Sequence, residues 1–288
     1  MPNEKKELSF EEKIARVKDY RPIDDTFFEV LAAEPGVCQE ILQIILEDPK
    51  LIVDPESIIV QSSKRNLYGR SVRLDALCTL GDGTKCNIEV QRSDDDDHLR
   101  RARFNASSIT VRESSPGDRF EEVVNLYIVF ISEFDFLGEG RTIYHVESVI
   151  LESGAVIDDG LHEVFVNTAI NDDTKIADLM SCFTKKEVND PRFPRMSEAV
   201  KRLKTTEGGV SAVCSLTQQY MDAARQEGLE EGLSRGLSQG ISQGISQGIS
   251  QGQSALADAI HDLHDGASRE ELLKKYDERT VDLAFSCR

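Results

Sequence analysis

An alternation of apolar and polar residues predicts a β-hairpin in the first third of the chain. The segments SVRLDALCTL (71–80) and KCNIEVQ (85–91) alternate with a period of two, the pattern of strands with one buried face. The intervening Gly81, Asp82 and Gly83 are typical of a three-residue hairpin loop. The sequence therefore predicts two antiparallel strands joined by a tight turn.

Similar patterns predict the elements on either side of this hairpin. Apolar residues run without alternation in the segment 121–132, which indicates a strand buried on both faces. Pro35 and Gly36 are expected to break the first helix into two pieces. The expected helices are 27–48, 97–113 and a broken set over 174–225, and the further expected strands are 57–61, 142–152 and 162–168. These elements predict one α/β domain over residues 21–226, preceded by a charged leader over residues 1–20.

The pattern changes abruptly at Gly228. Glycine recurs at every fourth position from 228 to 252, and a leucine or isoleucine follows each of the first six glycines. An isolated helix would lose roughly 7 kcal/mol from these glycines relative to alanine. The segment 227–253 is therefore either a loose tether or a helix that pairs with its copy in another chain, which would make the protein a homo-oligomer. A short helical tail is expected over 254–288, with a capping box at Ser268.

Charge is distributed unevenly along the chain. The 34 basic and 52 acidic residues leave a net charge of −18, which excludes a generally basic nucleic-acid coat. From Ser57 to Arg112, however, ten basic residues stand against seven acidic ones. A polyanion such as DNA could approach this segment, since phosphate affinity depends on the local cluster of charges. The alternative is ordinary solvated surface.

The chain lacks the features of a membrane protein. Its longest nearly apolar run, 123–131, is far shorter than the roughly 20 residues that span a bilayer. The first residues are charged and lack the apolar stretch of a signal peptide, so we expect a cytoplasmic location. The six cysteines show no spacing typical of zinc sites or disulfide frameworks and are expected to be reduced.

The predicted hairpin brings two acidic residues together. If its loop is symmetric about Asp82, Asp75 lies opposite Glu89 and Arg73 lies opposite Gln91. Facing carboxylates in neighbouring strands repel unless something neutralises them. A divalent cation would do so, and Mg²⁺ favours oxygen ligands. The alternative is a solvated sheet face on which basic side chains balance the two acids.

Several segments, in the same order, resemble those of a nuclease superfamily. The hairpin SVRLDALCTLGDGTKCNIEVQR is similar to that of the PD-(D/E)XK nucleases, specifically the Rpn branch of recombination-promoting nucleases and transposases. PIDDTFFEVLAA, DHLRRARFNASS and VVNLYIVFISEFDF resemble the family's N-terminal segment, its arginine-bearing helix and its next strand. This resemblance implies a restriction-endonuclease-like core, in which helices flank a mixed central sheet, and it covers roughly residues 21–225 and the repeat.

The resemblance also implies a reaction and its residues. The reaction would be hydrolysis of a DNA phosphodiester by a Mg²⁺-dependent endonuclease, with Mn²⁺ as an alternative cation. The cation would be held by Asp75, Glu89 and the Val90 carbonyl. Catalysis would use Asp75, Glu89 and Gln91, with Asp25 as a supporting acid and Arg73, Arg101 and Arg103 as phosphate or DNA contacts.

The sequence departs from the family pattern at three positions. Leu74 replaces a proline, Glu29 a basic residue and Asn105 an aromatic residue. Because the last two positions are expected to contact substrate, a second hypothesis stays open. The chain could be a catalytically idle DNA-binding or assembly protein on a nuclease fold.

Overall fold

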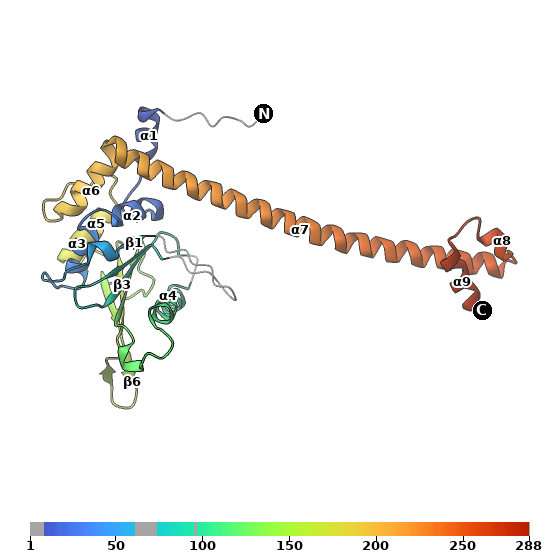
Figure 1. Cartoon of the computed structure of the whole chain (residues 1–288), viewed down its shortest axis with the longest axis horizontal. Helices are drawn as coiled ribbons and strands as arrows, with labels where there is room; N and C mark the ends of the chain where they lie inside the picture. The colour runs from blue at the N-terminus through green and yellow to red at the C-terminus, as the bar shows by residue number, and fades with distance from the viewer. Residues whose placement is uncertain (1–8, 61–73, 95–96, 288) are drawn as a thin grey trace. The chain divides into compact units, whose positions relative to one another are not determined.

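The computed structural model describes residues 9–60, 74–94 and 97–287. The chain divides into two compact units, Met1–Gln218 and Gln219–Arg288. The first unit contains a six-stranded sheet and its covering helices, and the second is helical (Figure 1). No helix within the described ranges has an apolar stretch long enough to cross a bilayer.

The central sheet is mixed, as the family resemblance implies. Its strand order is β1-β2-β3-β4-β8-β5. The strands β3, β4 and β8 run parallel to one another, whereas β1, β2 and β5 join the sheet in antiparallel pairs. The strands are β1 (Ile59–Val60), β2 (Ala76–Thr79), β3 (Lys85–Gln91), β4 (Leu126–Ser132), β5 (Ile143–Val146) and β8 (Leu161–Asn167).

The hairpin of β2 and β3 has the predicted register. Ala76 pairs with Ile88 and Thr79 with Lys85, so facing residue numbers sum to 164 as symmetry about Asp82 requires. Gly83 has a φ of +91°, a left-handed conformation that glycine adopts without strain. Arg73, predicted to lie opposite Gln91, falls outside the described residues.

Helices cover both faces of the sheet. The larger core lies on one face, where α2 (Asp25–Ala32), α3 (Val37–Ile45), α5 (Lys175–Phe183) and α6 (Pro194–Thr205) pack against it. The smaller core lies on the other face, where α4 (His98–Glu113) packs against β4. Figure 1 shows α4 standing apart from the other helices. Because β4 contributes to both cores, its apolar residues do not alternate with polar ones.

Three elements of the first unit differ from the sequence expectation. Within the expected leader, α1 (Phe10–Val17) is a capped helix that buries Val17 in the larger core. The strand expected over 142–152 is interrupted after β5. Its second half forms β6 (Ser148–Ile150), which pairs with the unpredicted β7 (Ala155–Ile157) in a separate two-stranded sheet. Two 3₁₀ turns, Pro55–Ser57 and Phe120–Glu122, precede β1 and β4.

The glycine repeat is helical. It belongs to α7 (Glu207–His264), which has 58 residues and continues into the tail expected over residues 254–288. After α7, Ser268 caps α8 (Arg269–Leu272) through the predicted capping box. A further helix, α9 (Glu278–Ser286), lies within the tail expected to be helical, although the sequence did not predict its bounds. Leu263, Leu272 and Val281 form a small core between these elements.

Candidate active site

The two predicted acids meet at the start of β2. Asp75 directly precedes this strand and Glu89 lies within β3, and their exposed fractions are 7% and 0%. The backbone N–H of Val90 donates to Asp75 Oδ2 at 2.9 Å, and the backbone N–H of Asp75 donates to Glu89 Oε1 at 3.3 Å. Each carboxylate is therefore held by a backbone group beside the other.

The direction of the β3 backbone explains this arrangement. Lys85 N–H donates to Asn125 on the β4 side, and Gln91 C=O accepts from Glu133 on the same side. Because alternate residues of a strand direct their backbone groups to opposite neighbours, Val90 directs its N–H and C=O toward β2. Asp75 satisfies the N–H with its side chain. The Val90 carbonyl therefore faces the side on which the Asp75 carboxylate lies.

The pKa values of both acids are raised, chiefly by burial. Burial raises the pKa of Asp75 well above its usual range, and the negative charge of Glu89 raises it further. The charge of Asp25 at the start of α2 acts in the same direction, which places this predicted supporting acid near the pair. Burial also raises the pKa of Glu89, although hydrogen bonds from Asn87 and the charge of Arg101 oppose the shift. The pair therefore favours binding of a proton or a cation.

Asn87 is a site residue that the sequence analysis did not single out. Its fully buried Nδ2 donates to Glu89 Oε1 at 2.9 Å. Among the described residues, Asn87 Oδ1 has no hydrogen-bond partner. The available signal was strand parity, which places Asn87 on the same face of β3 as Glu89.

Arg101 reaches the same carboxylate from α4. Its Nη1 donates to Gln91 Oε1 at 2.7 Å, and its Nη2 lies 3.4 Å from Glu89 Oε2. The Gln91 amide nitrogen donates in turn to the backbone oxygen of Ser93 at 3.0 Å. Gln91 is thus fixed at both ends of its amide group, and Arg101 places a positive charge beside it.

Two other arginines of α4, Arg100 and Arg103, interact elsewhere. Arg100 is exposed and pairs with Asp97 at the start of the helix. Arg103 is also exposed, and its charge partly offsets the burial that raises the pKa of Glu163 on β8. The structure therefore brings Arg101, but not Arg103, to Glu89. Helical geometry accounts for the difference, because residues two positions apart lie on different faces.

An ion-pair network borders the site. Arg92, the residue after Gln91, lies 2.9 Å from Asp24 and 3.5 Å from Glu133. Arg21 contacts the same two acids, at 3.3 and 2.6 Å. The network joins the start of α2 to the ends of β3 and β4, and so fixes the part of α2 that carries Asp25. Apart from the Arg21–Asp24 pair, its contacts join residues far apart in the sequence, and no local motif indicated them.

The donors at Asp75 and Glu89 fit a hard divalent cation. Two carboxylates and a backbone carbonyl are oxygen ligands of the kind that Mg²⁺ prefers, and Mg²⁺ commonly keeps several waters when only one or two carboxylates bind it. Within the described parts of the chain, no group of three or more His, Cys, Asp or Glu residues is arranged to hold a metal. Any cation here would therefore rely on water or substrate oxygen for its remaining ligands.

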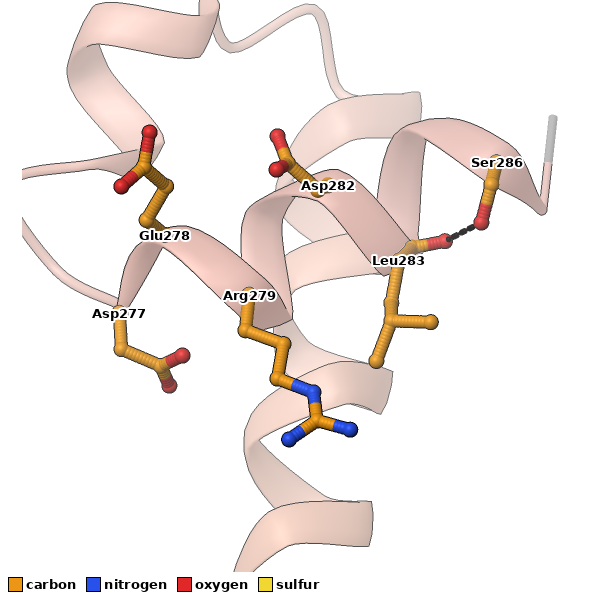
Figure 2. Close-up of a pocket in the computed structure, with 6 residues that line it drawn as sticks. All are labelled: Asp277, Glu278, Arg279, Asp282, Leu283 and Ser286. Carbon is orange, nitrogen blue, oxygen red and sulfur yellow. Dashed lines mark hydrogen bonds between the residues drawn. The ribbon is translucent and has the colours of Figure 1, made fainter.

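A surface depression in the second unit is not a second candidate active site. It is an open depression of about 660 Å³. Figure 2 shows that its side chains point in several directions instead of converging on a common point. Its lining residues are Asp277, Glu278, Arg279, Asp282, Leu283 and Ser286. The polar groups of this depression do not form a site that could orient a substrate.

Comparison with known proteins places the chain in a nuclease family. A protein-family model described as PD-(D/E)XK nuclease family transposase matches residues 23–178. No curated protein and no solved structure gives a significant match. The matched range contains Asp25, Asp75, Glu89, Gln91 and Arg101, and it covers more than half of the 288 residues. The chain therefore belongs to the PD-(D/E)XK nuclease family transposases.

Proposed function

We propose that this protein is a Mg²⁺-dependent DNA endonuclease that hydrolyses phosphodiester bonds. The observation that carries the proposal is the buried pair of Asp75 and Glu89, which lies within the nuclease-family match. Two adjacent buried carboxylates with raised pKa values are costly to keep charged unless a cation neutralises them. The family generally uses divalent metals, which makes a cation the natural partner of this pair.

Different residues of the site would bind the cation, orient the attacking water and neutralise the phosphate. A divalent cation, when bound, supplies charge next to the phosphate and lowers the pKa of a bound water. Asp75, Glu89 and the Val90 carbonyl would hold it. Gln91 would orient the attacking water or donate to a phosphate oxygen through its amide group. Arg101 would neutralise the phosphate, for which a guanidinium offers two parallel donors.

Cleavage of supercoiled plasmid tests the proposal. Wild-type protein should nick or linearise the plasmid in Mg²⁺ or Mn²⁺ and should leave it intact in EDTA. Asp75→Asn should remove this activity, because an amide does not supply the carboxylate charge. The proposal is wrong if folded wild-type protein cleaves neither duplex nor single-stranded DNA with either metal, or if EDTA has no effect.

A second candidate function is DNA binding or assembly without cleavage. Glu29 and Asn105 stand where the family pattern has a basic and an aromatic residue, and both are buried. Neither can contact DNA as the expected residue would. This candidate predicts metal-independent DNA binding with no cleavage, so the plasmid assay together with a binding measurement separates the two.

We also propose that α7 pairs with the same segment of a second chain. Its six repeat leucines and isoleucines are between 55% and 75% exposed, and apart from the neighbouring backbone of α7 itself no atom lies within 4 Å of where a Cβ would stand on the repeat glycines. A partner with the same four-residue period would cover the apolar side chains and approach closely at the glycines. A second copy of this chain has that period.

The geometry of the repeat supports such a pair. Each four-residue step turns about 400° around a helix, so the apolar stripe drifts by about 40° per repeat and completes one turn in roughly 54 Å. A right-handed pair crossing at about −40° follows such a stripe if the axes approach to about 6 Å, closer than the usual 8–10 Å. Glycine is the residue that permits this approach.

A cytoplasmic location is part of the proposal. The cysteines Cys38, Cys78 and Cys86 are buried and unbonded, and burial, with Cys78 nearby, raises the pKa of the Cys38 and Cys86 thiols. Cys78 and Cys86 face each other across the hairpin. Adjacent thiols of this kind are typical of a reducing compartment.

A further inference from the structure

Arg101 and a divalent cation would compete for the same carboxylate oxygen. Oε1 of Glu89 already accepts hydrogen bonds from Asn87 Nδ2 and from the Asp75 backbone N–H. Oε2 is contacted by Arg101 Nη2 at 3.4 Å. A cation shared by Asp75 and Glu89 would need an oxygen of Glu89, and at Oε2 its charge would repel the guanidinium that already contacts this oxygen.

Burial strengthens the interaction between Arg101 and Glu89. The Arg101 side chain is only 31% exposed and Glu89 is fully buried, so solvent screens the pair less than it screens a surface ion pair. Arg101 is also anchored by its shorter bond to Gln91 Oε1, at 2.7 Å. The guanidinium therefore sits where it offsets the Glu89 charge, and its second bond retains it beside the site.

We infer that Arg101 is a positioning residue that exchanges partners when a divalent cation binds. Without the cation, it neutralises Glu89 and holds Gln91. When the cation binds, it is displaced from Glu89 while it stays near Gln91, so its donors face the place where a phosphate would lie. This inference rests on the proposed cation site at Asp75 and Glu89.

The inference makes a prediction of unusual sign. If a residue supports the cation site, its removal should weaken cation binding. If Arg101 competes with the cation, Arg101→Ala should instead tighten cation binding while it slows DNA cleavage. We expect the affinity to rise by roughly ten-fold, on the scale of one charge-assisted hydrogen bond. Arg101→Lys keeps the charge but loses the fork of donors, and its affinity should fall between those of the other two proteins.

Calorimetric titration of Mn²⁺ into the full-length protein without DNA tests this sign. Two control variants each remove one positive charge without removing the contact to Glu89. Arg92→Ala removes a charge that is paired with Asp24 and Glu133, and Arg103→Ala removes an exposed charge on the same helix. If the contact matters, only Arg101→Ala should give the full increase. Equal tightening in all three variants would show a general charge effect and overturn the inference.

The remaining outcomes are also decisive. Unchanged or weaker Mn²⁺ binding in Arg101→Ala, with wild-type binding that Glu89→Gln abolishes, overturns the inference but keeps the proposed cation site. Saturable binding in Arg101→Ala with none detected in wild type would support the inference strongly. If neither protein binds Mn²⁺, the proposed cation site fails, and the inference fails with it.

Discussion

At the scale of single residues, the charged form of Asp75 destabilises the folded protein. Its carboxyl is buried beside Glu89, and both effects raise its pKa. The folded protein therefore binds more protons than the unfolded chain between the ordinary carboxyl pKa, about 4, and the raised value. Its free energy of unfolding must fall as pH rises through that range.

Asp75→Asn should therefore stabilise the protein at neutral pH. Asparagine can still accept the Val90 N–H with its side-chain oxygen, but it carries no charge. We expect a gain of at least about 1 kcal/mol in the free energy of unfolding at pH 7, because a tenfold change in proton affinity between the folded and unfolded states corresponds to about 1.4 kcal/mol. Chemical denaturation in EDTA over a pH series measures the difference between the two proteins.

The difference should shrink toward zero below about pH 3, where wild-type Asp75 is protonated in both the folded and the unfolded state. Added Mg²⁺ should stabilise wild type but not the variant. A constant or reversed difference across the pH series would mean that the Asp75 carboxylate is not strained in the folded protein.

Gln91 should matter less than the two acids. Its amide holds Arg101 and can orient water, but it carries no charge that a cation needs. We expect Gln91→Ala to slow cleavage by roughly 10²-fold, at the lower end of the range for a positioned proton-transfer group. Single-turnover rates at saturating Mg²⁺ measure this. A loss as large as that of Glu89→Gln would instead make Gln91 part of the cation site.

Strand alternation predicted the central pair, whereas the residues around it came from the family resemblance or only from the folded structure. Asp75 and Glu89 are related by strand alternation and one loop, so local rules placed them correctly. Arg101 was identified by family resemblance, since no spacing rule joins a helix to a particular strand residue. The Arg21–Glu133 contact links residues 112 positions apart, and only the folded structure could reveal it.

At the scale of elements, helices and turns with clear local sequence motifs were predicted correctly. The glycine-bounded loop and the capping box at Ser268 both formed as predicted. The strand expected over 142–152 was interrupted because its second half leaves the central sheet, and alternation cannot show which sheet a strand joins. The helix α9 has only 9 residues, with Val281 and Ala284 buried, so its periodic signal was weak.

The repeat in α7 offers a test in which two effects have opposite signs. Replacing Gly236, Gly240 and Gly244 by alanine should raise intrinsic helicity, by roughly 1 kcal/mol at each position. If two copies pack closely at these glycines, the added methyl groups should nevertheless weaken association. Sedimentation of the full-length protein over a concentration series measures the association, and circular dichroism measures the helicity.

The matched control replaces Ser238, Ser242 and Ser246 of the same repeats by alanine. This change should leave association nearly unchanged. Deletion of residues 228–252 should give a monomer whose first unit is still folded. An unchanged mass per particle after the deletion would refute pairing through the repeat.

At the scale of the whole molecule, charge limits how DNA can bind. The net charge is −18, and no lysine or arginine occurs between Arg141 and Lys175. Exposed basic residues such as Arg100 and Arg103 lie on α4 instead. DNA should therefore contact the protein through few phosphates, near the side of the sheet that carries Asp75 and Glu89.

DNA affinity should depend only modestly on salt. With about two or three phosphates neutralised, the slope of log affinity against log salt concentration should be about −2 to −3. Fluorescence anisotropy with an Asp75→Asn variant, which should bind without cleaving, measures this slope. A slope near −8 would indicate an extended basic surface, which is inconsistent with the observed charge distribution.

The central claim is that the buried pair of Asp75 and Glu89 performs metal-dependent DNA hydrolysis. The most direct measurement is the single-turnover rate of DNA cleavage in Mn²⁺ for wild type, Glu89→Gln and Glu121→Gln, where Glu121 is an exposed acid outside the site. We predict that Glu89→Gln slows cleavage by at least about 10³-fold, whereas Glu121→Gln matches wild type. Cleavage by folded Glu89→Gln at the wild-type rate would contradict the claim.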